Sequence, residues 1–401
     1  MTRRGGLDAV VAGGGVVGAA AALMLAREGL QVAMVEPKHP PAWTRESRDL
    51  RVYAFAPDSA RLLQELGAWQ QTLASRVQPY VRMQVWDAAG GEPLVFDADA
   101  LGQPQLGWIV EHALLVDALW KALPAAGVRV HCPARIETLE QSASGVRLRL
   151  DDGLLLDARF ALAADGAGSA LRGLAGIGST RNDYGQQGVV AFVASGVPHR
   201  QTCWQRFLPG GPVAFLPFAD DAASPALQGR IGSIVWTMAD ADATRVGTLD
   251  DDAFASELGA AFGGELGEMR MLSQRASFPL QRQLAETFVN GRVLLVGDAA
   301  HVVHPLAGQG VNLGLRDVTA LRDLVRDAKA RTVDIAAPHR LARWARVRRS
   351  ESAINAHAFE AINRVYSNDA MWPTLLRGPA LGLANRLPPL SRALWRHAAG
   401  I

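Results

Sequence analysis

The opening segment constrains the fold most, because it places a glycine-rich turn between a buried strand and a helix. Residues 7–12 read Leu-Asp-Ala-Val-Val-Ala and predict a strand. The turn Gly13-Gly-Gly15-Val-Val-Gly18 follows at once and leads into an alanine-rich helix through Arg27. A second strand, residues 31–36, ends in an acid. This order predicts a strand–helix–strand unit with a parallel pair of strands.

Each residue type in this unit suits a dinucleotide. Gly13 permits the tight turn, Gly15 lets a pyrophosphate approach the backbone, and Gly18 lets the helix pack close to the strand. Val17 lies inside the same turn, and Glu36 can accept hydrogen bonds from the adenosine ribose hydroxyls. An acid at this position favours an unphosphorylated ribose, as in FAD or NAD.

A stretch near residue 300 repeats the order of strand, turn and helix. Residues 293–296 predict a buried parallel strand, and Gly297-Asp298 ends it. A tight loop with Pro305 and two glycines then precedes a helix from about Val311. Open α/β sheets bind ligands at the carboxyl ends of their strands, and a helix N-terminus attracts anionic groups. An ordinary strand-to-helix turn has the same pattern; we favour a ligand site because two other stretches predict the same ligand.

The remaining stretch is residues 160–172. A buried strand ends in Asp165-Gly166, and a turn of small residues leads into a short helix that contains Arg172. Ser169 lacks the glycine that would complete a nucleophile elbow, so the pattern does not predict a serine nucleophile.

The predicted fold is α/β, with a discontinuous Rossmann-like cofactor domain, an inserted antiparallel sheet and a C-terminal helical region. The chain has 401 residues, 49% of them hydrophobic, which is enough for two domains. The character of the chain changes near residue 181, and alternating segments such as 188–195, 213–218 and 231–238 predict an antiparallel sheet. The strand at 293–296 returns the chain to the first domain. We expect the cofactor domain at 1–180 and 276–335, which also contributes to the substrate pocket. The substrate-binding sheet is expected at 181–275 and the C-terminal helices at 336–401.

Composition excludes several classes of protein. A net charge of +2 without a block dense in Lys and Arg gives no reason to expect nucleic acid as a partner. Cys132 and Cys203 lie far apart and predict neither a metal site nor a redox-active dithiol. A reducing compartment, the cytoplasm, is therefore expected. Glycines or charges interrupt each long apolar run, so no transmembrane helix is predicted.

The three stretches together resemble a known family. The turn at Gly13–Gly18 with Glu36, the Asp165-Gly166 pair, and Gly297-Asp298 with Gly308–Asn312 are similar to the FAD-dependent aromatic hydroxylases that fold like p-hydroxybenzoate hydroxylase. The text from Gly297 to Leu315 resembles the ubiquinone-biosynthesis hydroxylases in particular, as does Asp49-Leu-Arg51. The similarity covers nearly the whole chain.

The resemblance implies a tightly bound, non-covalent FAD. Glu36 would hold the adenosine ribose, Arg51 would lie near the ribityl-phosphate region, and Asp298 would contact the ribityl chain. Asp165-Gly166 would belong to a motif linked to both FAD and NAD(P)H. The loop and helix start after Asp298 would line the flavin ring, through Pro305, Gly308, Gln309, Gly310, Val311, Asn312 and Leu313.

The resemblance also implies a reaction. The expected enzyme is a flavoprotein monooxygenase that hydroxylates the ring of a polyprenyl phenol in ubiquinone biosynthesis, with NAD(P)H as a transient reductant and O2 as co-substrate. Reduced flavin forms a C4a-hydroperoxide whose distal oxygen an electron-rich phenol attacks. A single Gly-x-Gly-x-x-Gly agrees with a nicotinamide that visits rather than stays. The alternatives are an FAD monooxygenase acting on another aromatic or an alkene, and a non-catalytic flavin-binding scaffold of a biosynthetic complex.

His301 and His304 are the candidates for acid–base catalysis, although a histidine beside a proline loop is more often structural. We expect His304 and Pro305 to shape the pocket above the flavin. If they do, His304→Ala lowers turnover while FAD stays bound, and unchanged coupled hydroxylation would reject that role.

The final segment, residues 370–401, holds four arginines, no acid, and the two tryptophans Trp372 and Trp395. A pair of helices packed on the core is the favoured interpretation. The alternative is a basic, aromatic surface for an anionic membrane or for other proteins of ubiquinone biosynthesis. That alternative places the protein peripherally at the inner face of the membrane.

Overall fold

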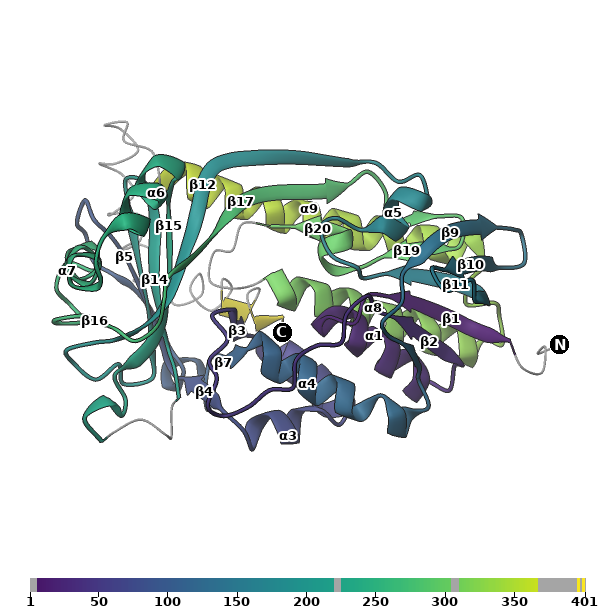
Figure 1. The fold of residues 1–401 in the computed structure, drawn as a ribbon, viewed down its shortest axis with the longest axis horizontal. Helices are drawn as coiled ribbons and strands as arrows, with labels where there is room; N and C mark the ends of the chain where they lie inside the picture. Colours follow the sequence, from purple (N-terminus) through teal and green to yellow (C-terminus); the bar gives the residue numbers. More distant parts are fainter. Residues whose placement is uncertain (1–5, 220–224, 304–309, 367–394, 397–398, 401) are drawn as a thin grey trace.

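The computed structural model describes residues 6–219, 225–303, 310–366, 395–396 and 399–400, with backbone alone over 355–366. Figure 1 shows two large sheets side by side, one at each end of the molecule, with the helix α9 running along both. The fold is α/β, as the sequence predicts.

The first sheet has a parallel centre in the order β19-β11-β1-β2-β8. Its strands β1 and β11 are almost wholly apolar where they pair, and Ala9 lies opposite Phe160 with both side chains buried. Strands β9, β10 and β18 extend the sheet in antiparallel pairing. The bounds are β1 Leu7–Ala12, β2 Val32–Val35, β8 Arg129–His131, β9 Ile136–Gln141, β10 Val146–Leu150, β11 Leu155–Ala163, β18 Val289–Asn290 and β19 Val293–Leu295.

Helices α1 (Val16–Arg27), α4 (His112–Ala122) and α8 (Gly310–Ala330) lie together beside β1 and β2 (Figure 1). Residues 19–22 of α1 are four consecutive alanines, all fully buried, and their small side chains allow close approach of helix and sheet. Residue Gly314 of α8 sits against the first turn of α1: an added Cβ would lie 2.6 Å from the Val17 side chain.

The second sheet follows the order β20-β17-β12-β15-β14-β13-β5-β6, with β16 beside β12. Neighbours are antiparallel except for β13 and β5. Strands β12 and β17 are long and reach from the first sheet into the second (Figure 1). The bounds are β5 Arg82–Asp87, β6 Leu94–Asp97, β12 Ser179–Ala194, β13 Thr202–Leu208, β14 Gly211–Pro217, β15 Ile231–Ala239, β16 Arg270–Met271, β17 Ala276–Ala285 and β20 His301–Val302.

A small third sheet, β3-β7-β4, lies between the two large ones, and helices complete the fold. Helices α6 and α7 bury an apolar face, including Phe254 and Leu258, against the second sheet. The bounds are β3 Val52–Phe55, β4 Val77–Tyr80, β7 Gly107–Glu111, α2 Pro57–Glu65, α3 Trp69–Leu73, α5 Ala170–Leu174, α6 Asp240–Thr248, α7 Asp251–Ala261 and α9 Pro338–Tyr366.

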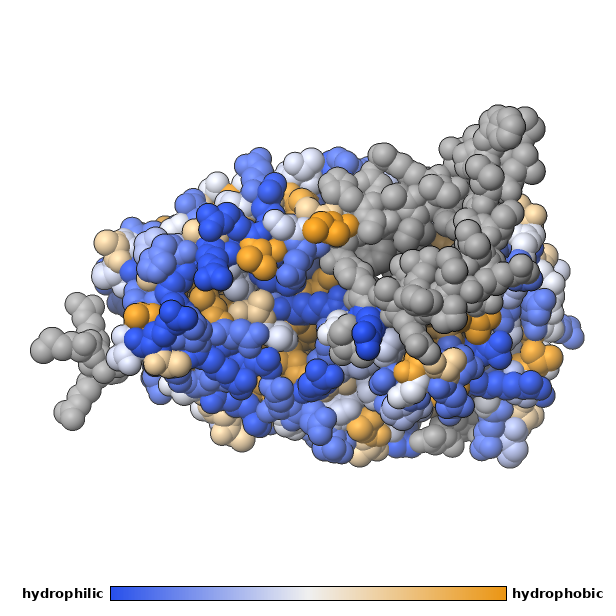
Figure 2. Space-filling view, turned by 180° about the vertical axis from the view of Figure 1, so that it is seen from behind, coloured by the Kyte–Doolittle hydropathy of each residue, from blue (hydrophilic) through white to orange (hydrophobic). Residues whose placement is uncertain are grey.

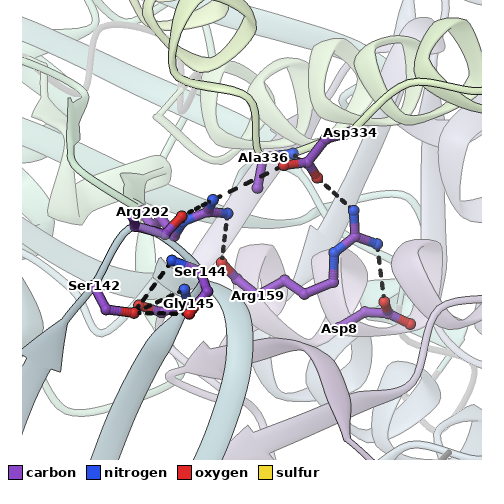
Figure 3. A network of polar contacts seen from close by, with 9 residues as sticks. Asp8, Ser142, Ser144, Gly145, Arg159, Arg292, Asp334 and Ala336 are labelled. Atoms are coloured by element: carbon purple, nitrogen blue, oxygen red, sulfur yellow. Dashed lines mark hydrogen bonds and ion pairs between the residues drawn. The ribbon is translucent and has the colours of Figure 1, made fainter. Parts of the chain in front are cut away.

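An arginine network ties the parallel strands together at their amino ends (Figure 3). Arg159 of β11 reaches Asp8 of β1 at 3.1 Å and also pairs with Asp334, which follows α8. Arg292, just before β19, donates to the backbone oxygens of Arg159 and Ala143. The glycine turns leave the opposite edge of the same strands, so this network stabilises the sheet away from the predicted site.

Two observations refine the predicted organisation. The first half of β12, residues 179–187, was missed because its side chains are mostly exposed and polar, and only pairing with β17 makes it a strand. The second sheet also takes strands from 82–97, 276–285 and 301–302, outside the predicted insert at 181–275. The expected boundary at 276 therefore cuts across one sheet, and the division into domains remains a prediction.

Most of the C-terminal segment predicted to pack or to bind a membrane lies outside the described residues. Of its two tryptophans, Trp395 is described, and it is buried against Ala98 and Leu106, as expected of core packing. The described part of the rear face is mostly hydrophilic with scattered apolar residues (Figure 2). Among the described helices, none has the length and apolar character needed to cross a bilayer.

Candidate cofactor and active site

The three predicted stretches meet at one edge of the first sheet. In the parallel register Ala12 pairs with Ala163, and Ala163 pairs with Leu295, so the turns after β1, β11 and β19 emerge side by side. The backbone joins them further: Ala164 N donates to Ala12 O at 2.8 Å, and Val296 N donates to Ala163 O at 3.0 Å. The carboxyl edge of a parallel sheet is where open α/β folds bind ligands.

The glycines of the first turn have different physical roles. Gly13 has a φ of +100°, and a Cβ there would lie 2.4 Å from the Ala164 carbonyl oxygen. A Cβ at Gly18 would lie 2.0 Å from the Gly13 oxygen. Nothing lies within 4 Å of the corresponding position at Gly15. Protein packing requires Gly13 and Gly18, whereas Gly15 borders open space at the N-terminus of α1, as a turn that cradles a pyrophosphate requires.

Glu36 closes this turn from the end of β2. Its Oε2 accepts a hydrogen bond from Gly14 N at 2.6 Å, and its Oε1 accepts one from Lys38 N at 3.2 Å. The Trp120 indole donates to Gly14 O at 2.7 Å. A carboxylate has further lone pairs, so Glu36 can still accept from a ribose. Sequence reasoning missed Trp120, which is one of several tryptophans on helices and carries no local signal.

The Asp165 carboxylate stabilises the turn that begins at this residue. It accepts from the Ser169 hydroxyl and, at 3.1 Å, from Leu171 N, while Ser169 Oγ accepts from Arg172 N at 3.0 Å. These bonds form the N-terminal cap of the short helix α5. Gly166 has a φ of +84° and borders open space. Asp165 therefore shapes the loop, and the backbone near Gly166 is the part open to a ligand.

Arg172 links the second and third stretches, a role that sequence reasoning did not assign. It is buried and donates to Ala299 O and to Ala167 O, both at 2.9 Å. Ala167 O also accepts from Gln283 of β17 at 3.0 Å. One guanidinium thus fixes the loops after β11 and β19 relative to each other, and the contact to β17 joins them to the second sheet.

Asp298 follows β19 at the same edge of the sheet. Its side chain is exposed, yet many protein atoms surround it; burial raises its pKa, and the charges of His301 and Arg51 oppose that rise. Arg51 is exposed as well and comes close enough to Asp298 for this effect. Gly297 precedes it with a φ of +57°, and a Cβ there would lie 3.2 Å from the Val17 side chain. Val17, in the first turn of α1, therefore packs against Gly297 and against Gly314 of α8.

A buried ionic cluster supports the Asp298 loop from behind. The carboxylate of Asp317, on α8, accepts from Gly297 N at 2.9 Å and from Arg348 Nε of α9 at 2.7 Å. Its other neighbour is His301 Nε2, also at 2.7 Å. Asp317 and His301 are almost completely buried, and the neighbouring donors hold the pKa of Asp317 below its usual value despite burial. His301 is thus a structural residue here, as the more common interpretation predicts.

Asn312 joins the start of α8 to β3. Its Oδ1 accepts from Ala56 N at 3.0 Å, and its Nδ2 donates to Ala54 O at 2.8 Å. Val311 and Leu313 are buried on either side of it. All three side chains pack against or bond to other parts of the protein, so this helix start would contact a ligand through its backbone N–H groups. Gly310 begins α8 and has open space at its Cβ position, whereas His304, Pro305, Gly308 and Gln309 lie outside the described residues.

An apolar cavity opens beside this helix start. Asn312, Ala54 and Ala56 form one wall, and the second sheet forms the other. The sheet side and neighbouring segments contribute mostly apolar and aromatic groups: Tyr80, Met83, Phe96, Leu106, Cys203, Leu216 and Trp395. Burial raises the pKa of the Cys203 thiol, which stays neutral. Among the described residues, no cluster of His, Cys, Asp or Glu could hold a metal ion. The cavity suits an apolar ring close to the cofactor edge.

These residues fit FAD on observations of the chain itself. The turn at Gly15 and the loop at Gly166 are open, Glu36 bonds to the backbone of the first turn, and the exposed side chains of Arg51 and Asp298 lie near each other. The predicted residues within the described range are thus brought to one edge of the fold. Their individual contacts to FAD remain predictions.

Comparisons with known proteins agree with this geometry. Residues 6–347 match the family model described as "FAD binding domain". Ubiquinone hydroxylase UbiL of Rhodospirillum rubrum is 36% identical, covering 98% of this chain and 89% of that protein. The 3-demethoxyubiquinol 3-hydroxylase of Escherichia coli is 34% identical, covering 98% of both. The crystal structure of p-nitrophenol 4-monooxygenase PnpA of Pseudomonas putida DLL-E4 superposes with a TM-score of 0.76 at 18% identity, covering 98% of both chains.

Proposed function

Since the chain belongs to the FAD-dependent monooxygenases with an FAD binding domain, and to their ubiquinone-biosynthesis hydroxylases in particular, we propose that it hydroxylates the ring of a polyprenyl phenol. NAD(P)H would be the reductant and O2 the co-substrate. The observation that carries the substrate class is the apolar cavity at the start of α8, which shares Asn312 with the cofactor residues.

The geometry of the site supports one arrangement of the residues that would hold FAD. The β1–α1 turn and Glu36 would hold its adenosine and pyrophosphate end, and Arg51 with Asp298 its central part. The first turn of α8 would offer backbone N–H groups and the positive end of its dipole to the flavin ring. Bound FAD, once reduced, supplies the electrons that activate O2 for transfer of one oxygen atom to an electron-rich ring.

The chain's own task is to position the ring and keep water away from it. Met83, Phe96, Leu106 and Leu216 present apolar surface to the cavity, so a phenol would displace little ordered water on entry. Asn312 holds the backbone of residues 54–56 against α8, which fixes the cavity wall relative to the cofactor edge. Neither task needs a nucleophilic side chain.

The test is NAD(P)H oxidation in air by the FAD-loaded protein, with and without a prenylated phenol. We expect the phenol to stimulate oxidation and to become one oxygen atom heavier. Stimulation by a different aromatic alone would reject the polyprenyl phenol and leave a monooxygenase of other specificity. FAD binding without stimulation by any phenol would point to the scaffold alternative.

A further inference from the structure

Two side chains near Arg51 and Asp298 have no role in the site so far. Tyr53 of β3 and His112, the first residue of α4, are hydrogen-bonded at 2.9 Å between Oη and Nδ1. Their rings meet edge to face, with centroids 5.8 Å apart and an interplanar angle of 71°. Both are half-buried, and both come from elements that converge on Arg51.

The backbone places Arg51 next to this pair. Arg51 directly precedes β3, two residues before Tyr53, and its side chain lies within hydrogen-bonding reach of the Tyr53 hydroxyl. The Arg51 oxygen accepts from His112 N at 2.9 Å, which joins the start of α4 to the same residue. Asp49 joins the chain before β3 to the start of α4, because its carboxylate accepts from Arg51 N and from Ala113 N, both at 2.9 Å.

The donors and acceptors fix the direction of the polar chain. A guanidinium only donates, so the Tyr53 oxygen can accept from Arg51 while its proton goes to His112 Nδ1. This requires a neutral His112 with its proton on Nε2. Burial first, and then the Arg51 charge, lower the pKa of His112 to about 4, which keeps the ring neutral at physiological pH. Burial raises the pKa of Tyr53, so its hydroxyl keeps its proton even though Arg51 favours the phenolate.

We propose that Tyr53 and His112 are positioning residues for Arg51: their hydrogen bond directs the Tyr53 oxygen toward the guanidinium and holds it beside Asp298, where FAD is expected. The proposal rests on the proposed cofactor site. An arginine held in place before binding loses less conformational freedom when its ligand arrives. Without the Tyr53 hydroxyl, Arg51 would keep its charge and lose a fixed direction.

The test measures FAD affinity of the apoprotein by flavin fluorescence, independently of turnover. Tyr53→Phe removes one oxygen atom, and His112→Leu removes the partner acceptor. We expect each to raise the Kd for FAD about tenfold, which corresponds to about 1.4 kcal/mol, with little change in the thermal midpoint of the apoprotein. Because the two variants break the same hydrogen bond from opposite ends, either one that folds is sufficient.

Two further variants separate positioning from packing. His112→Asn keeps an acceptor near the position of Nδ1 and should retain most of the parental affinity. In an Arg51→Ala background, Tyr53→Phe should have no further effect, because its influence passes through the guanidinium. Parental affinity in Tyr53→Phe, or an equal loss with and without Arg51, would overturn the proposal. If the parent binds FAD and hydroxylates no phenol, the proposed function fails. The Kd values would still test whether Tyr53 and His112 position Arg51.

Discussion

The buried pair Arg76 and Glu111 provides the strongest test of how the loop before β3 is held. The side chains are 2% and 0% exposed, and Glu111 accepts from Arg76 Nη2 at 2.7 Å and from Arg76 Nε at 2.9 Å. Glu111 also accepts from Asp49 N at 2.9 Å and from the Trp43 indole at 3.2 Å. Arg76 donates to the backbone of Arg45 and Ser47 as well. This pair therefore anchors the segment that leads to the cofactor site.

We predict that Glu111→Gln lowers the free energy of unfolding by about 3–5 kcal/mol, because it leaves the Arg76 charge buried without its partner. The amide also turns an N–H donor toward groups that only donate. Arg76→Met should cost a similar amount by leaving the Glu111 carboxylate uncompensated. Since the whole protein is expected to be stable by about 5–15 kcal/mol, either change should be obvious in urea unfolding followed by tryptophan fluorescence.

The double variant Arg76→Met with Glu111→Leu distinguishes a buried ion pair from simple packing. Removing both charges should cost less than the sum of the two single changes, by at least about 2 kcal/mol. Some loss should remain, because the backbone groups of residues 45–49 lose their partners. The exposed pair Arg147 and Asp157 is the matched control, and its removal should leave the unfolding midpoint unchanged. If the loss of unfolding free energy in the double variant equals the sum of the two single losses, the reasoning is refuted. It is also refuted if Glu111→Gln unfolds within about 1 kcal/mol of the parent, which is roughly the limit for an exposed pair.

Three further predictions follow from single residues. Gly15→Ala should leave the thermal midpoint of the apoprotein unchanged, since no atom lies within 4 Å of the added Cβ. It should weaken FAD binding at least about tenfold. An unchanged FAD affinity would contradict a pyrophosphate site at this turn. Asn312→Leu should cost about 2–5 kcal/mol in chemical unfolding, because it strands the buried Ala56 N–H and Ala54 oxygen. Burial lowers the pKa of His199 to about 4, so the unfolded state binds more protons between pH 6.5 and 4. The free energy of unfolding should therefore decrease as the pH is lowered from 6.5 to 4, by up to about 3 kcal/mol more than in His199→Asn. Parallel pH curves for the parent and the variant would contradict this prediction.

Several elements could be predicted from local pattern alone. The strand at residues 7–12, the helix that runs to Arg27 and the strand at 293–296 all have an apolar run or a turn signal that is complete within a few residues. Elements that depend on distant partners were missed or misplaced. The β3 strand and the polar half of β12 carry no such period, and pairing with β7 and β17 makes them strands.

The same division applies to the candidate site. Composition and spacing determined the cofactor class, because a Gly-x-Gly-x-x-Gly turn followed by Glu36 has few other physical uses. The sequence also predicted that the strands before Asp165 and Asp298 would be buried, and that the strand at 293–296 would be parallel. Only the tertiary structure decided which side chains remain free for a ligand. Asp165 caps a helix, Asn312 hydrogen-bonds to the backbone at β3, and His301 pairs with Asp317. Each follows because a buried polar group needs a partner, and the nearest partner can lie hundreds of residues away in the sequence.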